Sequence, residues 1–141
     1  MTLNDVIRWA RQRSPWVLHL NSGGCNGCDI EIVDLLTPRY DVERLGILEV
    51  VSPRHADILL CTGPVTRQAR DRLLRIYDQV PARKWVMPVG TCACSGGVFA
   101  GGYNVLGSID QLLPVSVYVP GCVVRPEAII VSLQQLLRQV S

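Results

Sequence analysis

Two cysteines in a glycine-rich turn are the residues of this chain best suited to chemistry. Cys25 and Cys28 stand two residues apart in the run Asn21–Glu31, which reads N-S-G-G-C-N-G-C-D-I-E. This spacing lets both thiolates face one metal centre, and the glycines let the backbone turn sharply and approach a bulky group. The run therefore predicts a metal-binding turn. The alternatives are a disulfide or two small buried residues.

Two further cysteines also stand beside glycine. Cys92 lies in the run G-T-C-A-C-S-G-G at 90–97, and Cys122 follows Pro120 and Gly121. Each comes directly after an apolar segment that resembles a strand, as do Cys25 and Cys28. Because open parallel sheets bind ligands outside the carboxyl ends of their strands, we expect the four thiols at one edge. Four thiolates suit an iron–sulfur cluster or a structural zinc.

The arrangement favours an iron–sulfur cluster over zinc. Structural zinc sites commonly use two close cysteine pairs, whereas this chain offers one pair and two distant single cysteines. Glycine turns also leave room and backbone N–H donors for a bulky anionic cluster. Cys61 lies inside an apolar segment and is expected to be buried. Cys94 could compete with Cys92 as a ligand, but a place in the core or behind the ligands is favoured.

Composition limits the kind of protein. The chain has 141 residues, enough for one domain, 1–141, of which 1–14 is an N-terminal helical segment. Charged residues make up 18% and hydrophobic ones 48%, which indicates a subunit covered by partners. A net charge of +2 is too small to favour nucleic acid. No run approaches the ~20 apolar residues of a membrane span, and no signal-peptide core is present, so a reducing cytosolic compartment is expected.

Strands and helices alternate along the sequence. Apolar runs predict strands at 16–20, 45–50, 56–61, 84–89 and 116–119, and helical spacing predicts helices at 3–13, 29–36, 66–80 and from Pro126 to about Val140. In the second helix, Ile30, Val33 and Leu36 fall along one side. Alternation of this kind predicts an α/β fold. We expect a flavodoxin-like, five-stranded parallel sheet of order 2-1-3-4-5 with helices on both faces.

The runs C-N-G-C-D-I-E, G-T-C-A-C-S-G-G and P-G-C-V-V-R-P-E, in this order, resemble the small subunit of nickel–iron hydrogenases. The resemblance spans about 16–137 and is strongest to the group 4 membrane-bound energy-converting enzymes, including the carbon-monoxide-induced type. These subunits are similar to the cluster-bearing 20-kilodalton subunit of complex I. That subunit has adjacent cysteines in its first motif, whereas two residues separate Cys25 and Cys28 here, which argues for the hydrogenase branch.

The resemblance implies one 4Fe–4S cluster, held by Cys25, Cys28, Cys92 and Cys122 beside the active site of a separate large subunit. The chain would be a non-catalytic subunit, relaying electrons from a ferredoxin-like polyferredoxin subunit to the nickel–iron centre, where protons become hydrogen. Its partners would include integral membrane subunits, and it would sit peripherally on the cytoplasmic side of the membrane. The rivals are a cluster subunit of a complex-I-like or sulfur-reducing enzyme without nickel, and a zinc-stabilised interaction module.

Several other residues carry weaker signals. Glu31 follows Cys28 by three residues and so faces about the same side of its helix. We favour a proton-relay role for it, which the resemblance supports; otherwise it is a carboxylate stabilising a helix N-terminus by ~0.3–1 kcal/mol. Arg54 either faces the cluster or the large subunit, or is solvated, and His55 is expected to form loop hydrogen bonds. The arginine-rich N-terminal helix either docks on a membrane subunit or ends in solvent.

Overall fold

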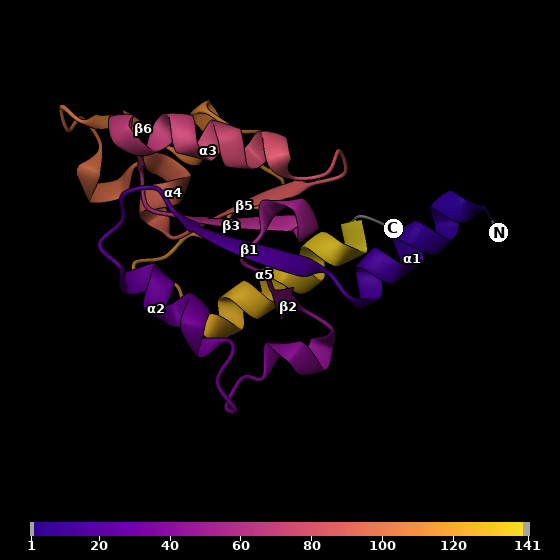
Figure 1. Ribbon diagram of the computed structural model, residues 1–141. Coiled ribbons are helices and arrows are strands. Elements are labelled where there is room, and N and C mark those ends of the chain that lie inside the picture. The colour runs from indigo at the N-terminus through magenta and orange to yellow at the C-terminus, as the bar shows by residue number, and fades with distance from the viewer. Residues whose placement is uncertain (1, 140–141) are drawn as a thin grey trace.

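A parallel sheet with helices on both faces forms the centre of the computed structural model, which describes residues 2–139 (Figure 1). Its strands are β1 (Trp16–Asn21), β2 (Leu48–Glu49), β3 (Ile58–Thr62) and β5 (Trp85–Val89), in the order β2-β1-β3-β5. All three strand pairs are parallel. The predicted α/β class is confirmed, and the first four predicted strands occur in the predicted order.

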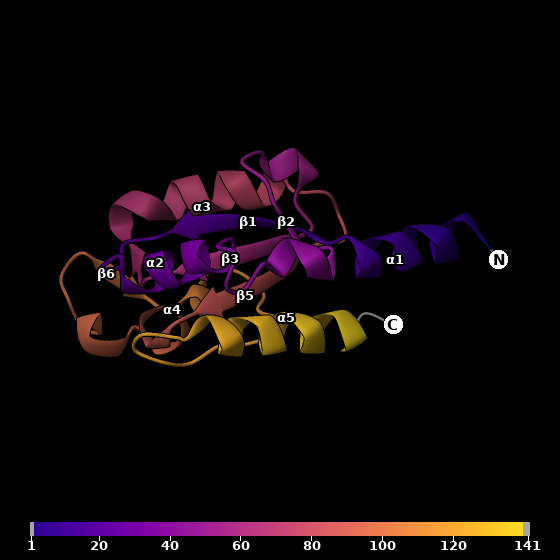
Figure 2. The same cartoon turned by 90° about the horizontal axis from the view of Figure 1, so that it is seen from below.

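Helices cover both faces of this sheet, as Figures 1 and 2 show. Helices α2 (Gly27–Asp34) and α5 (Pro126–Gln139) pack on one face, and α3 (Arg67–Gln79) and α4 (Thr91–Ser95) on the other. A small antiparallel pair, β4 (Val65–Thr66) and β6 (Val105–Gly107), lies beside α3. Short 3₁₀ turns occupy Val42–Leu45, Pro53–His55, Gly97–Phe99 and Ile109–Gln111.

The central strand β3 shows why the sheet needs both layers. Ile58 and Leu60 pack toward α2 and α5, while Leu59 and Cys61 pack toward α3. All four side chains are buried, the pattern of a parallel strand covered on both sides. The predicted burial of Cys61 is confirmed, and this burial raises the pKa of its thiol to about 12.

The segment at 116–119 is not a fifth strand, so that prediction is wrong. It meets β5 through an isolated parallel bridge between Val89 and Val119. Ser116 N donates to Val86 O at 2.9 Å, and Val119 N donates to Pro88 O at 3.0 Å. Between these two bonds the segment advances by three residues, whereas β5 advances by two. Pro88 has no backbone N–H with which to donate a hydrogen bond back to this segment. The register therefore slips, although the segment lies beside β5, where the expected order puts it.

The second strand is shorter than the predicted 45–50. A 3₁₀ turn at Val42–Leu45 takes its start, and the turn ends at Gly46 with φ +83°. A Cβ at Gly46 would collide with the carbonyl of Arg13, so this turn requires glycine. The result is a two-residue edge strand, and a short edge offers little unpaired backbone to other chains.

The predicted helices form, but two of them do not bury their apolar sides. Thr66 caps α3, and α5 buries Ile129, Leu133 and Leu136; Val140 lies outside the described residues. In α2, however, Ile32 is buried, while Ile30 and Val33 are 61% and 55% exposed; the helix ends at Asp34, short of the predicted residue 36, and Leu36 is 39% exposed. Helix α1 (Leu3–Arg13) has no buried residue and extends away from the sheet (Figures 1 and 2).

Candidate metal centre

The loops at the carboxyl edge of the sheet bring the four cysteines together. Cys25 lies in the loop after β1, Cys28 is the second residue of α2, Cys92 is the second residue of α4, and Cys122 follows the bridge at Val119. Cys25 and Cys122 are exposed, and the other two are half-buried. All four are free thiols, so the predicted metal-binding turn does not contain a disulfide.

The electrostatics of the thiols reflects this grouping. Burial raises the pKa of the Cys28 thiol, and the negative charges of Asp29 and of the Cys25 and Cys92 thiolates raise it further. Burial likewise raises the pKa of Cys92, with added contributions from the thiolates of Cys122 and Cys25. Thiolates that raise one another's pKa lie close together. A bound cation or cluster would remove this repulsion.

Glycines make room for the sulfurs. Gly90 has φ +95°, and a Cβ built there would stand 2.5 Å from Cys28 Sγ. At Gly97, with φ +52°, a Cβ would stand 3.1 Å from Cys92 Sγ. Side chains at these two positions would push the thiols from their places. These turns therefore form a cradle for the sulfurs rather than ordinary loop connections.

Backbone groups tie the cysteine loops together. Thr91 N donates to Gly121 O at 2.9 Å, and Gly121 N donates to Thr91 Oγ1 at 3.2 Å. These two bonds join the Cys92 loop to the Cys122 loop. The backbone N–H of Val124 bonds the Cys28 sulfur and lowers its pKa against the effect of burial. Three chain segments are thus fixed relative to one another.

Thiolates are soft ligands, and the donor set fits an iron–sulfur cluster or zinc. A small hollow between the loops is lined by Cys25, Cys28 and Cys92, by Gly24 and Gly63, and by the polar residues Asp29 and Thr62. Within residues 2–139, His, Cys, Asp and Glu side chains do not form a group of three or more placed to hold a single metal ion. The features that suit this site to an iron–sulfur cluster or zinc are therefore the set of four thiols and the glycines that make room for them.

Cys94 is not among the residues that line this hollow. Its Sγ lies 3.6 Å from the carbonyl oxygen of Pro88, on β5, and burial raises its pKa. Cys94 is therefore a half-buried thiol bonded to a strand carbonyl, whereas Cys25, Cys28 and Cys92 line the hollow between the loops.

Glu31 is half-buried on α2, and its side chain forms no hydrogen bond or ion pair with the other described residues. Arg54 and His55 are exposed in the 3₁₀ turn before β3, at the amino edge of the sheet and so opposite the thiols. The His55 ring lies edge-on to Trp16, with centroids 6.1 Å apart.

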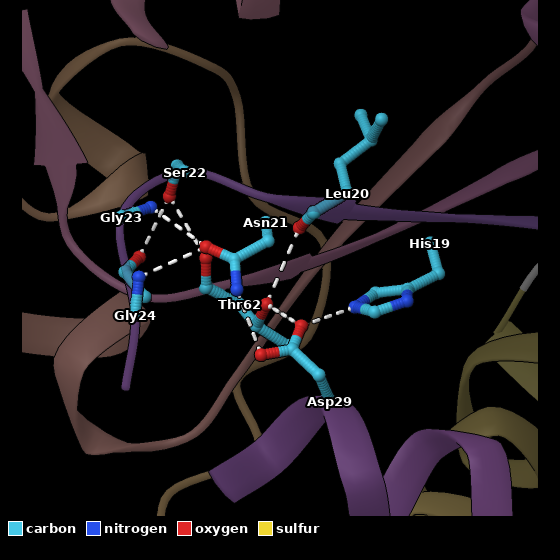
Figure 3. Close-up of polar contacts among 9 residues, drawn as sticks. His19, Leu20, Asn21, Ser22, Gly23, Gly24, Asp29 and Thr62 are labelled. Carbon is cyan, nitrogen blue, oxygen red and sulfur yellow. Dashed lines mark hydrogen bonds and ion pairs between the residues drawn. The ribbon is translucent and has the colours of Figure 1, made fainter. Parts of the chain in front are cut away.

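Behind the thiols lies a polar cluster that sequence reasoning missed (Figure 3). The carboxylate of Asp29 is buried beside Cys28. Its Oδ1 accepts from His19 Nε2 and from Thr62 Oγ1, both at 2.6 Å, and its Oδ2 accepts from Asn21 Nδ2 at 2.8 Å. Asn21 Oδ1 in turn accepts from the backbone N–H groups of Gly23 and Gly24, at 2.8 and 2.9 Å. The available signal was polar residues inside otherwise apolar strands.

An apolar surface borders the thiols. Ile30 and Val33 are exposed on α2, the helix that carries Cys28, and Leu36 is exposed two residues after the helix ends; we call these three residues the α2 patch. Val123, next to Cys122, is also exposed. Exposed apolar side chains gathered beside exposed thiols indicate a surface that a partner covers.

A protein-family model described as "NADH ubiquinone oxidoreductase, 20 Kd subunit" matches residues 25–136. A probable membrane-bound hydrogenase subunit, mbhJ, of Pyrococcus furiosus is 56% identical over 118 residues, covering 84% of this chain and 71% of that protein. An NADH-quinone oxidoreductase subunit of Bacteroides thetaiotaomicron is 42% identical over 139 residues, covering 98% of this chain and 69% of that protein.

A solved structure, that of the membrane-bound sulfane sulfur reductase, an archaeal respiratory membrane complex, contains a chain of the same fold. The TM-score is 0.84 at 38% sequence identity, covering 96% of this chain and 75% of that one. Residues 2–139 contain no helix with both the length and the apolar character needed to cross a bilayer.

Proposed function

The chain belongs to the family of the 20-kilodalton subunit of NADH ubiquinone oxidoreductase, and from this membership we propose that it is the electron-transferring small subunit of a membrane-bound nickel–iron hydrogenase. In this role the chain is a subunit of an oxidoreductase complex and does not itself catalyse the reaction. One 4Fe–4S cluster is the proposed cofactor, with Cys25, Cys28, Cys92 and Cys122 as its ligands.

The observation that carries this proposal is the meeting of four thiols from three chain segments at one sheet edge, in a glycine cradle. A bound 4Fe–4S cluster would take up and release single electrons. The chain supplies its position and surroundings. The N–H of Val124 bonds the Cys28 sulfur and that of Val98 bonds the Cys92 sulfur, and hydrogen bonds to ligand sulfurs tune a cluster's potential.

The proposed partner at the cluster edge is a hydrogenase large subunit that holds the nickel–iron centre. The α2 patch and the exposed Cys25 and Cys122 support contact there, because covering them would bury apolar surface and shield the cluster from water. Electrons would arrive from a ferredoxin-like polyferredoxin subunit and reach the nickel–iron centre through the cluster.

Glu31 is proposed as a proton relay at this boundary. Glu31 lies on α2, three residues after Cys28. Its half-buried carboxylate has no hydrogen-bond or ion-pair partner among the described residues. A carboxylate free of internal hydrogen bonds can accept and pass on a proton near the large subunit. Hydrogen production requires protons as well as electrons.

A membrane location is proposed from helix α1 and from the relatives, whose names include a membrane-bound hydrogenase and a respiratory membrane complex. The exposed apolar side of α1 would dock on integral membrane subunits, placing the chain peripherally on the cytoplasmic side.

Affinity purification of the complex through a tag on this chain, under anaerobic conditions, tests the proposal. We expect iron and acid-labile sulfide for one cubane cluster per chain, an electron paramagnetic resonance signal on reduction, nickel in a co-purified large subunit, and hydrogen evolution. A complex whose chain holds zinc without sulfide would establish the interaction-module alternative instead.

The similarity to a chain of the sulfane sulfur reductase supports a second candidate, a cluster subunit of a sulfur-reducing or complex-I-like enzyme without nickel. The greater identity to the hydrogenase subunit, 56% against 38%, favours the first. An iron–sulfur complex that contains no nickel and evolves no hydrogen would decide for the second.

A further inference from the structure

We propose that Asp29 and Asn21 form a hydrogen-bonded clamp that positions Cys25 and Cys28 to receive and keep the cluster. This inference rests on the proposed function only in assuming that the thiols hold a cluster. We call the two residues the loop clamp. They are positioning residues: Asp29 lies at the edge of the hollow between the cysteine loops, but its carboxylate oxygens bond His19, Thr62 and Asn21.

The clamp closes the cysteine loop on itself (Figure 3). Asn21 is the last residue of β1 and Asp29 the third residue of α2, so both cysteines lie in the chain between them. The 2.8 Å bond from Asn21 Nδ2 to Asp29 Oδ2 joins the two ends of this loop. At the start of the loop, Asn21 Oδ1 also fixes the N–H groups of Gly23 and Gly24. One side chain thus sets both the first turn and the closure.

The sheet holds the clamp in place. Asp29 Oδ1 accepts from His19 on β1 and from Thr62 on β3, each at 2.6 Å. Asp29 and Thr62 are buried, and within residues 2–139 every buried side-chain polar atom has a hydrogen-bond partner. Fully satisfied buried networks are rigid, whereas a broken one leaves costly unpaired groups. The cysteine loop is therefore held rigidly, because Asp29 is bonded to two neighbouring strands of the sheet.

The clamp acts on the thiols through short covalent links. Asp29 is bonded to Cys28 along the chain, and Gly24 precedes Cys25 directly. Gly24 also approaches Gly63 so closely that a Cβ on Gly63 would collide with its backbone. Movement at either end of the clamp would shift a sulfur, and residues that orient ligands commonly change metal affinity by about 10–100-fold when mutated.

Variants at Asn21 can break the clamp in two ways, and a second substitution can restore it. Asn21→Leu removes the amide without changing charge. Asn21→Asp keeps the shape and the acceptor for Gly23 and Gly24 but sets a carboxylate against Asp29. The double variant Asn21→Asp with Asp29→Asn exchanges the two groups. The amide introduced at position 29 can then donate to the carboxylate introduced at position 21, while its oxygen still accepts from His19 and Thr62. The double variant also restores the original net charge.

The readouts are iron loss from the anaerobic complex to a chelator at pH 8 and the resonance spectrum of the reduced cluster. We expect both single variants to lose iron about tenfold faster, with a changed spectrum, and the double variant to resemble wild type. Asn104→Leu, at an exposed loop asparagine, is the matched control and should match wild type.

The outcomes separate the clamp from the cluster itself. A wild-type complex without iron and sulfide rejects the proposed function before any variant is made. Single variants that keep the wild-type rate and spectrum overturn the clamp, as does an effect of Asn21→Asp without one of Asn21→Leu, which would indicate charge alone. If a single variant fails to assemble, a double variant that assembles with its cluster supports the clamp, and one that also fails overturns it.

Discussion

The six cysteines occupy three kinds of environment. Four stand among glycines at the carboxyl edge of the sheet, Cys94 bonds the carbonyl of Pro88, and Cys61 is fully buried inside β3. A thiolate binds a metal only where it can shed its proton and reach the centre. The environments therefore support the proposed ligand set with information that spacing alone does not contain.

Substitutions at Cys92 and Cys94 test this division. Cys92→Ser, like serine at the other three proposed ligands, should abolish or distort the cluster signal, because a hydroxyl poorly replaces a soft thiolate. Cys94→Ala should retain the signal. Iron content and the resonance spectrum of the purified complex are the measurements. Loss of the cluster in Cys94→Ala together with its retention in Cys92→Ala would reverse the ligand assignment.

Cys61 should be almost inert to alkylation. With a pKa of about 12 in place of 9.0, its thiolate fraction at pH 8 is about 1000-fold lower than that of an ordinary thiol. Burial blocks the reagent as well. Mass spectrometry after iodoacetamide treatment should show Cys61 unmodified in the native complex and modified after denaturation. Rapid labelling in the native complex would contradict its place in the core.

Replacing Glu31 tests the proton relay. Glu31→Gln keeps the shape of the side chain but cannot carry a proton in the same way. It should leave cluster content and assembly intact while slowing hydrogen evolution by about tenfold or more, within the ~10²–10⁴ scale of proton-transfer catalysis. The exposed Glu43→Gln is the control and should not change turnover. Normal turnover in Glu31→Gln would leave this residue as a helix-end carboxylate.

The thiols were predictable because parallel topology puts strand ends together, however far apart they are in sequence. Asp29 was not predictable, because its role depends on three partners from two strands that no periodicity reveals. His19, Asn21 and Thr62 are polar residues in otherwise apolar strands, but the sequence does not indicate that they share one partner.

At the scale of elements, helix positions were predictable, but the faces they bury were not. Apolar residues at 30, 33 and 36, in and just after α2, suggest a core stripe, yet the core takes Ile32 and the C-cap residue Leu35. Periodicity reports that a side is apolar without saying whether the same chain or a partner covers it. The predicted strand at 116–119 was also only partly predictable. The alternation of strands and helices predicts its place beside β5, but Pro88 prevents a regular ladder of hydrogen bonds there.

Helix α2 carries an interface prediction. Val33→Asp puts a charge into the α2 patch and should weaken binding of the large subunit by ~2 kcal/mol, or about 30-fold, as at a buried interface residue. Val131→Asp, at an equally apolar and exposed position on α5, is the matched control. Co-purification yield and the dissociation constant are the measurements. Equal losses in both variants would show general destabilisation rather than an interface at α2.

Across the whole molecule, the two exposed apolar surfaces lie at opposite ends. The cysteine loop and the start of α2 follow the carboxyl end of β1, and α1 extends from its amino end (Figures 1 and 2). At the foot of α1, a cavity of about 450 Å³ is lined by Arg8, Arg11 and Arg83 together with Trp85. Two partners can therefore bind this chain at once without competing, as a relay between subunits requires.

Helix α1 should decide membrane attachment independently of the cluster. Leu3, Val6, Ile7 and Ala10 form one side of the helix, and all are exposed; Leu3 is 76% and Ile7 37% exposed. The capping box between Thr2 and Asp5 stabilises the helix without any help from the sheet. This apolar side has no cover among the described residues, so an acidic substitution on it should cost little folding free energy.

We therefore expect Leu3→Asp combined with Ile7→Asp to move the complex, or this chain with its large subunit, from the membrane to the soluble fraction. Cluster content should not change, because the thiols lie at the far end of β1. Asn4→Asp adds a charge to the same helix outside the apolar side and should leave the complex on the membrane. Fractionation with iron analysis is the measurement. Full membrane retention of the double variant would show that other subunits hold the complex there and that α1 ends in solvent, whereas loss of the cluster along with attachment would mean that the two ends are not independent.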